Sequence, residues 1–157
     1  MLSRLDRDGY REVDWTAISD EDRREIAAIR ENGEPLAREF DPLHPGFQAQ
    51  LVPEVSVLLK RGDRIAGWVT ATRGLRPDMC HYSNGYIVPE LRNRGWLIAG
   101  MCSVCERQSG AFGPKSLALF ETRPDNTRMR RLMERGLAPY SLWTDIRYRT
   151  EKTLRDR

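Results

Sequence analysis

Apolar residues follow two different periods along the chain, and each period predicts a type of element. Runs in which apolar, β-branched and aromatic residues alternate or adjoin predict strands. Such runs cover residues 9–18, 55–60, 65–72, 81–88, 116–122 and 140–149. The second and third runs flank a Gly-Asp pair, which favours a tight turn between them. These runs therefore predict a sheet that contains at least one hairpin.

Stretches of helical period alternate with these runs. The first helix is expected to begin at Ser19 or Asp20, because a capping residue there precedes several acidic residues. It is expected to end at Asn32-Gly33. Further helices are predicted over residues 34–40, 95–108 and 126–135.

The order of these elements indicates an α/β (α+β) domain with a mixed sheet. The strand–helix–strand unit over residues 81–122 should place its two strands side by side and parallel. A length of 157 residues fits a single domain. No apolar run approaches the roughly 20 residues that cross a membrane, and the first twenty residues lack a signal-peptide core. We therefore expect one cytoplasmic domain, over residues 1–157, with no membrane partner.

The net charge and the cysteines indicate whether to expect nucleic acid, disulfides or a metal. The net charge is only +3 and acidic residues are interspersed among the arginines, so no basic stripe predicts binding to nucleic acid. The chain has three cysteines, Cys80, Cys102 and Cys105, and no cluster of histidines. An odd number of cysteines without a signal peptide argues against a disulfide scaffold. We expect core cysteines and no metal, because free cysteine is among the most buried residue types.

The stretch from Ile87 to Leu97 carries the clearest chemistry. Its sequence, IVPELRNRGWL, follows a predicted strand, makes a tight basic turn that contains Gly95, and leads into a predicted helix. Such a junction gathers free backbone N–H groups and the positive end of a helix dipole at one point, where a pyrophosphate can bind. Gly95 permits the turn and lets the backbone approach a ligand closely.

This stretch resembles the pyrophosphate loop of the GNAT N-acetyltransferase superfamily, whose pattern is roughly V-x-P-E-x-R-x-R-G-x-G/A. The match runs from Ile87 to Gly95, and Leu97 stands where the family usually has Gly or Ala. A second stretch, FETRPDN at residues 120–126, resembles the family's strand-to-helix segment L-E-V-x-x-x-N. The two motifs stand in the family's order, and the resemblance covers residues 55–149.

The resemblance implies a GNAT-like fold, with a mixed, mostly antiparallel central sheet flanked by helices. The strands that end near Ile87 and Glu121 would splay apart, and acetyl-CoA would sit in that gap as the acyl donor. Residues 55–150 would form the cofactor-binding core, and residues 1–54, including the loop at 41–47, would shape the variable acceptor side. The residues implied to bind the cofactor are Tyr86, Ile87, Arg92, Asn93, Arg94, Gly95, Trp96, Leu97, Ile98 and Asn126.

The same resemblance bears on acid–base chemistry. An amine attacks a thioester only when it is deprotonated, so such an enzyme needs a base. Glu121 stands where some members carry a catalytic Glu, and His81 is a second candidate base. The usual general acid is a Tyr seven residues after the Asn, and here Met133 occupies that position. The substitutes that we consider for it are Tyr140, Tyr82 and Ser83.

The expected function is direct transfer of an acetyl or other short acyl group from CoA to a small-molecule or peptide amine. The rival interpretation, which Leu97 and Met133 favour, is a non-catalytic CoA-binding or sensing domain with the same fold. Structural roles also remain open: Glu121 as a carboxylate paired with an arginine, and Asn126 as a helix N-cap. Trp68 and Trp96 are expected to be packing residues, and a homodimer remains open.

Overall fold

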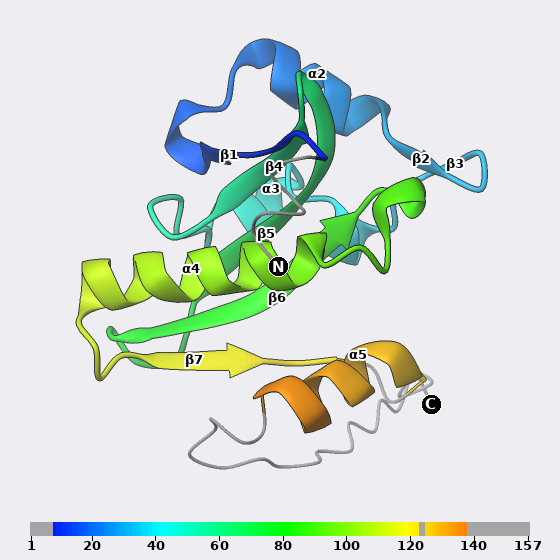
Figure 1. The fold of residues 1–157 in the computed structure, drawn as a ribbon. Coiled ribbons are helices and arrows are strands. Elements are labelled where there is room, and N and C mark those ends of the chain that lie inside the picture. The colour runs from blue at the N-terminus through cyan, green and yellow to red at the C-terminus, as the bar shows by residue number, and fades with distance from the viewer. Residues whose placement is uncertain (1–7, 123–124, 138–157) are drawn as a thin grey trace, which may run out of the picture. The chain divides into compact units, whose positions relative to one another are not determined.

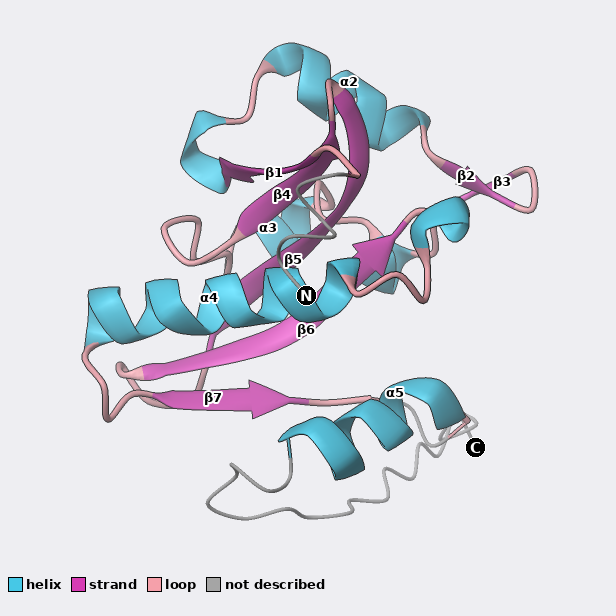
Figure 2. Ribbon diagram, viewed as in Figure 1, coloured by secondary structure: helices cyan, strands magenta, loops and turns pink. Residues whose placement is uncertain are grey.

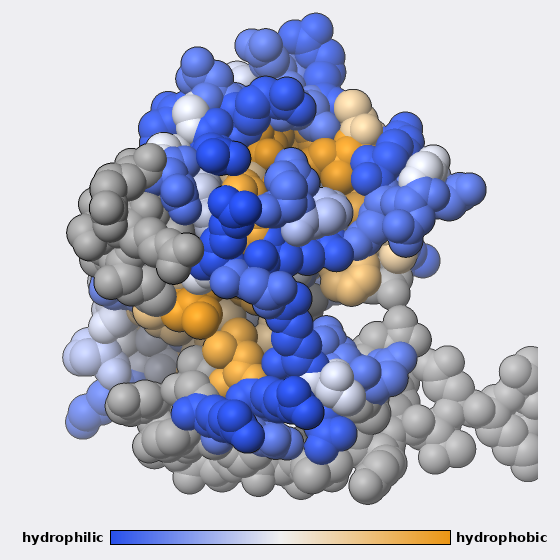
Figure 3. All heavy atoms as spheres, turned by 45° about the vertical axis from the view of Figure 1, so that its right-hand side comes forward, coloured by the Kyte–Doolittle hydropathy of each residue, from blue (hydrophilic) through white to orange (hydrophobic). Residues whose placement is uncertain are grey.

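The computed structural model describes residues 8–122 and 125–137. The chain divides into two compact units, Met1–Glu121 and Thr122–Arg157. The predicted strand at 140–149 and Tyr140 lie outside the described residues. Hydrophilic side chains cover most of the described surface in the view of Figure 3, and apolar side chains show in smaller areas between them.

Among the described residues, a sheet of five strands forms the centre of the first unit (Figure 1). Its strands are β1 (Tyr10–Asp14), β4 (Val57–Arg61), β5 (Arg64–Arg73), β6 (Met79–Ile87) and β7 (Leu117–Phe120). They lie in the order β1-β4-β5-β6-β7, and only the β6–β7 pair is parallel. The structure therefore confirms a mixed, mostly antiparallel sheet and the parallel pair predicted over residues 81–122.

Helices α2 (Asp20–Ala28) and α4 (Trp96–Phe112) cover opposite faces of this sheet (Figure 2). Gly100 of α4 lies against the side chains of Leu59 and Val69. Leu58 and Trp68, each one residue away, instead belong to the core cluster that contains Ile26 of α2. Successive side chains of a strand point to opposite faces, so the two helices lie on opposite sides. This two-sided cover explains why β5 is buried along almost its whole length.

The start of α2 follows the sequence prediction closely. The Ser19 hydroxyl accepts a hydrogen bond from the Asp22 amide, and the Asp22 carboxylate accepts one from the Ser19 amide, at 3.1 and 3.0 Å. This reciprocal pair satisfies two amides that a helix start leaves without partners. The other carboxylate oxygen of Asp22 lies 2.5 Å from Nζ of Lys60 on β4, in a pair that is almost fully buried. The ion pair therefore fixes α2 to the sheet.

We expect this ion pair to make the free energy of unfolding depend on pH in the acidic range. Burial alone raises the pKa of Asp22, but the hydrogen bonds from Lys60 and Ser19 outweigh it and hold the pKa below its ordinary value of 3.8. The stabilisation is therefore present above that value and is lost as the pH falls through the lower pKa of the folded state. Asp22→Asn should lower the free energy of unfolding at pH 7 by about 3 kcal/mol. Urea titrations from pH 7 to pH 3 test this; an acid dependence identical to that of the parent chain would contradict it.

The helix predicted over residues 34–40 is wrong. Residues Arg30–Glu31 (β2) and Glu34–Pro35 (β3) instead form a small hairpin, followed by a 3₁₀ turn over Arg38–Phe40. Asn32 and Gly33 both have positive φ, at 55° and 85°, which is the backbone of a tight hairpin turn. Pro35 also biases the residue before it toward an extended conformation. The Asn-Gly pair thus turns a hairpin rather than merely ending a helix.

Other boundaries also differ from the prediction. Helix α2 ends at Ala28 and not at Asn32-Gly33, and β7 covers Leu117–Phe120 and not residues 116–122. The first strand is shorter than 9–18, because a 3₁₀ turn over Trp15–Ala17 follows β1. The loop at 41–47 leads into a short helix, α3 (Pro45–Gln48), which the His44 side chain caps. Helix α4 continues past residue 108 to Phe112, so Gly110 lies within it.

The second unit is described over residues 122 and 125–137. Helix α5 (Thr127–Leu132) is followed by a π-helical turn over Met133–Leu137, close to the helix predicted over 126–135. The Asn126 side chain accepts a hydrogen bond from the Met129 amide at 3.1 Å. Asn126 is therefore the N-cap of α5.

Candidate functional site

Strands β6 and β7 pair over only four residues and then separate. Their parallel pairing runs from Met79 opposite Leu117 to Tyr82 opposite Phe120. Beyond Tyr82, β6 pairs only with β5 in the described part of the chain. Its remaining residues therefore have no strand partner among the described residues on the side that β7 has left, although the Ile87 carbonyl accepts a hydrogen bond from Nε of Arg92.

A β-bulge in β6 lies at this point of separation. Thr70 of β5 lies opposite Asn84, but Thr72 lies opposite His81, so β6 has one residue more than its partner in this interval. A bulge bends the strand that carries the extra residue and increases its twist. The bend explains why β6 leaves β7 here. We call the region where β6 and β7 stop pairing the fork.

The junction after β6 builds the geometry that its sequence predicts. Asn93 and Gly95 have positive φ, at 71° and 88°, and α4 begins at Trp96. Glycine suits the left-handed position directly before the helix, and asparagine is one of the few other residues that tolerate it. The Ala99 amide donates to the Gly95 carbonyl. The amides of residues 96–98 precede this bond, so they lie at the positive end of the helix dipole without helical acceptors.

The two arginines of this junction behave differently. Arg92 is tied to the protein: Nε donates to the Ile87 carbonyl at 2.9 Å, and Nη2 donates to Glu31 of β2 at 2.5 Å. Its guanidinium also lies over the Tyr86 ring, 5.5 Å from the ring centre. Arg94 is exposed and forms no ion pair with a described residue. Arg94 is therefore the arginine of this loop that is available to a phosphate.

Leu97 packs onto a glycine of the neighbouring strand. A Cβ atom placed on Gly85 of β6 would lie 3.2 Å from Cδ1 of Leu97. The absence of a side chain at residue 85 makes room for the larger side chain at residue 97. The Leu97 side chain thus points toward the sheet, and Gly85 of β6 leaves room for it.

We expect this pair to behave as a coupled unit. Gly85→Ala should lower the free energy of unfolding by about 1 kcal/mol, because the new methyl group crowds Leu97. Leu97→Ala alone removes buried apolar surface, at a cost of about 1–2 kcal/mol for a half-buried leucine. The double variant should cost less than the sum of the two, and a double-mutant cycle by urea unfolding measures the difference. Strict additivity would show that the two side chains do not meet.

His81 and Glu121 come together at the fork. Nε2 of His81 lies 3.1 Å from Oε2 of Glu121. The parallel register explains the contact, because His81 lies opposite Leu119 and Glu121 follows on the same face two residues later. The carboxylate is 62% exposed and the imidazole 24% exposed, so the pair is open to solvent on the side of Glu121. Sequence reasoning named both residues but not their contact.

Comparison with known proteins decides the fold. No family model matches the chain, and no curated protein sequence matches it. Solved structures do. The ribosomal-protein-S18-alanine N-acetyltransferase from Escherichia coli has a TM-score of 0.57 at 14% identity, covering 80% of this chain and 74% of that one. AAC(6')-Iy, in complex with the bisubstrate analogue CoA-S-monomethyl-acetylneamine, has a TM-score of 0.57 at 15% identity, covering 91% and 97%.

An aminoglycoside acetyltransferase from an uncultured soil metagenomic sample, in complex with trehalose, has a TM-score of 0.58 at 8% identity, covering 94% and 99%. These neighbours are GNAT acetyltransferases. The chain has the GNAT fold. The fold implied by the resemblance of residues 87–97 and 120–126 is therefore confirmed.

Several residues that the GNAT resemblance singled out have structural roles here. Trp68 and Trp96 are almost fully buried, as expected of packing residues. The Tyr86 ring is buried as well and stacks on the Trp68 ring, with the two ring centres 4.8 Å apart. The Tyr82 hydroxyl donates to Gln108 at 2.6 Å and stays in the core beneath α4, which makes it a poor general acid. Ile98 is 38% exposed, beside the free first-turn amides of α4.

The remaining expectations for the GNAT-like site are not resolved by the described residues. Asn126 and Met133 lie in the second unit, and Tyr140 lies outside the described residues. The roles of Asn126 toward the pantetheine and of Tyr140 as an acid stay predictions.

The cysteines and the metal expectation can be compared with the structure. Cys80 is buried, but Cys102 and Cys105 are exposed, so the prediction of core cysteines is wrong for these two. They lie on the side of α4 that faces away from the sheet, where the helical period places them.

Among the described residues, no three His, Cys, Asp or Glu side chains gather as metal ligands would. No helix of the described part is long and apolar enough to span a bilayer.

Proposed function

We propose that the chain is an N-acetyltransferase that moves an acetyl or other short acyl group from acyl-CoA to an amine by direct transfer. The observation that carries the proposal is the His81–Glu121 pair at the fork, 3.1 Å apart and open to solvent. A domain that only bound CoA would need the junction before α4 but not an imidazole and a carboxylate beside the fork. The GNAT fold and its acetyltransferase neighbours support the same conclusion.

The residues present fit acyl-CoA. The free amides of residues 96–98, with those of Asn93 and Arg94 before them, would hold the pyrophosphate, and the Arg94 side chain would add charge. The unpaired edge of β6 after the fork would receive the amide groups of the pantetheine arm, as a strand edge receives a peptide. Because Leu97 packs on Gly85, its side chain leaves the first-turn amides accessible.

Acyl-CoA, when bound, supplies the acyl group as a thioester. The Glu121 carboxylate takes the proton from the attacking amine, and His81, whose Nε2 lies 3.1 Å from that carboxylate, would receive the proton from it. The nitrogen would form the C–N bond as the C–S bond breaks, and the proton taken from the amine would pass from the His81–Glu121 pair to the departing sulfur, which regenerates the base. A backbone N–H of β6 at the fork would stabilise the charge that develops on the carbonyl oxygen.

The alternative is a non-catalytic CoA-binding or sensing domain, which Met133 favours because it replaces the usual tyrosine acid. A thiol-release assay with acetyl-CoA and a panel of amines tests the proposal: an aminoglycoside, a polyamine, free amino acids and a peptide N-terminus. Release of CoA with at least one amine, and a product heavier by one acetyl group, is expected. If acetyl-CoA binds but CoA is released with none of these amines, the enzyme is rejected in favour of the sensing domain.

A further inference from the structure

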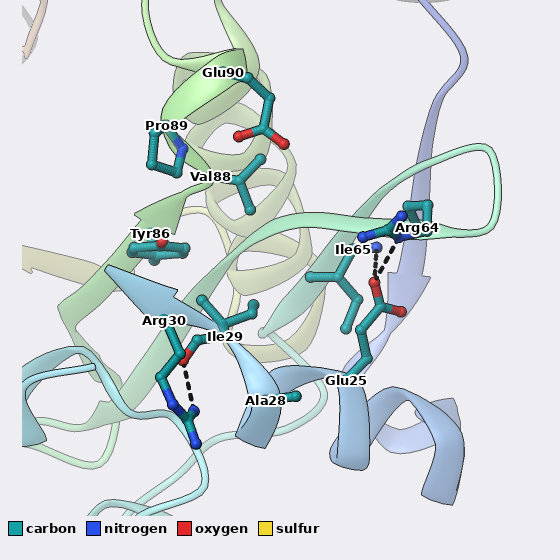
Figure 4. A pocket seen from close by; sticks show the side chains of 10 residues that line it. All are labelled: Glu25, Ala28, Ile29, Arg30, Arg64, Ile65, Tyr86, Val88, Pro89 and Glu90. Carbon is teal, nitrogen blue, oxygen red and sulfur yellow. Dashed lines mark hydrogen bonds and ion pairs between the residues drawn. The ribbon is translucent and has the colours of Figure 1, made fainter. Parts of the chain in front are cut away.

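The hairpin of β2 and β3 projects from the first unit (Figure 1). Its two strands pair with each other and do not belong to the central sheet. A cavity of about 280 Å³ lies between the start of this hairpin and the end of β6 with the turn after it (Figure 4). Ile29 and Arg30 line one side of the cavity, and Tyr86, Val88 and Pro89 line the other. The start of the hairpin therefore does not pack closely on the segment that leads into α4.

An ion pair bridges these two segments. Nη2 of Arg92 donates to Oε1 of Glu31 at 2.5 Å, and Nε of Arg92 donates to the Ile87 carbonyl at 2.9 Å. Glu31 thereby joins β2 to the first residue after the 3₁₀ turn Pro89–Leu91. The Arg92 and Glu31 side chains are 36% and 33% exposed, so a solute can reach both. An ion pair this open to water contributes little net free energy and can be exchanged for another partner.

The same ion pair reduces the positive charge that the loop offers to a phosphate. Arg92 directly precedes Asn93, at the start of the loop whose free amides are proposed to hold the donor pyrophosphate. The Glu31 carboxylate neutralises Arg92 and brings a negative charge to this loop. Both effects oppose the approach of an anion. A guanidinium has five N–H donors, and the bonds to Ile87 and Glu31 use two of them, so Arg92 keeps donors for a phosphate.

We propose that Glu31 competes with the donor phosphate for Arg92: when acyl-CoA binds, Arg92 exchanges Glu31 for the pyrophosphate, and the β2–β3 hairpin is released from the loop. This inference rests on the acyl-CoA site of the proposed function. A pyrophosphate carries more negative charge than one carboxylate, so it displaces Glu31, and the lost ion pair lowers the affinity for the donor. Donor binding is thus coupled to the freedom of the hairpin, and the coupling is reciprocal.

Calorimetric titrations with free CoA test the competition. Glu31→Gln should bind CoA about threefold to fivefold more tightly than the parent chain, because Arg92 then lacks its carboxylate partner. The matched control Glu34→Gln removes the same charge from the other strand of the hairpin and should bind CoA as the parent chain does. Arg92→Gln should weaken the binding. In that background, Glu31→Gln should have no larger effect than Glu34→Gln, since Glu31 acts through Arg92.

Amide shifts of ¹⁵N-labelled protein test the release of the hairpin. Saturating CoA should shift the amides of Gly33 and Glu34 in the parent chain. In Arg92→Gln these shifts should be absent at saturating CoA, because the ion pair that holds the hairpin is already missing.

Three results would overturn the inference: unchanged CoA affinity in Glu31→Gln, an equal gain in Glu34→Gln, or the full gain from Glu31→Gln when Arg92 is absent. If the parent chain binds CoA and any of these results is obtained, the competition is rejected and the donor site stands. If CoA binds neither to the parent chain nor to Glu31→Gln, the donor site is rejected and the competition with it.

Discussion

Replacing His81 with alanine is expected to lower kcat for acyl transfer about 100-fold or more while leaving the affinity for acetyl-CoA unchanged. His81 lies 3.1 Å from Glu121 at the fork, and the proposed donor contacts lie on the backbone of β6 and of residues 93–98. Removal of the imidazole therefore takes away a proton-transfer group without touching the groups that hold CoA. Initial-rate kinetics with thiol detection measure kcat, and calorimetry measures the affinity.

His81 and Glu121 should also act as one unit. Glu121→Gln should cause a loss similar to that of His81→Ala, and the double variant should be little worse than either, because the second change removes a group that no longer functions. Asp63→Asn, at the fully exposed tip of the β4–β5 hairpin, is the matched control and should keep the parent kcat. Full activity of His81→Ala would remove the pair from the mechanism.

Gly67→Ala is expected to lower the free energy of unfolding by about 3 kcal/mol or more. Gly67 has φ of 155°, and a Cβ atom there would lie 2.1 Å from the Tyr86 carbonyl oxygen and 2.8 Å from Cδ1 of Ile87. The methyl group would thus collide with the backbone of the next strand, which cannot move away without breaking the β5–β6 pairing. Urea unfolding followed by tryptophan fluorescence measures the loss.

Gly62→Ala provides the control for this substitution. Gly62 lies in the hairpin turn with φ of 58°, and a Cβ atom there would meet nothing within 4 Å. Its replacement should cost only the left-handed backbone strain, about 1–2 kcal/mol. If Gly67→Ala were no more destabilising than Gly62→Ala, the close approach of β5 and β6 would be contradicted.

The sequence predicts most of the sheet because its strands are long apolar runs with clear breakers between them. The parallel β6–β7 pair was predictable from the strand–helix–strand order alone. The hairpin at residues 30–35 was missed because Asn-Gly was interpreted as a helix stop, although the same pair favours a two-residue turn. The bulge in β6 has no local signal, since it depends on how β6 pairs with β5.

The candidate site was predicted residue by residue but not as a contact. Glu121 and His81 were both named as bases, and only the register of β6 and β7 brings them together across 40 positions of sequence. Arg92 fits a phosphate-loop pattern, but in the structure it donates hydrogen bonds to Glu31 and to the Ile87 carbonyl. Glu31 lies 61 positions away in the sequence, and the carbonyl is a backbone group, so neither contact has a sequence signal. The compensation of Leu97 by Gly85 likewise depends on tertiary packing.

Calorimetric titration of the purified protein with acetyl-CoA, with free CoA as the comparison, tests the central claim most directly. The claim is that the free amides between Asn93 and Ile98, at the end of the strand that forms the fork, hold the donor. Saturable binding of both compounds, weakened in Arg94→Glu and unchanged in Asp63→Asn, is the predicted result. Absence of binding by either compound to the folded protein would contradict the claim.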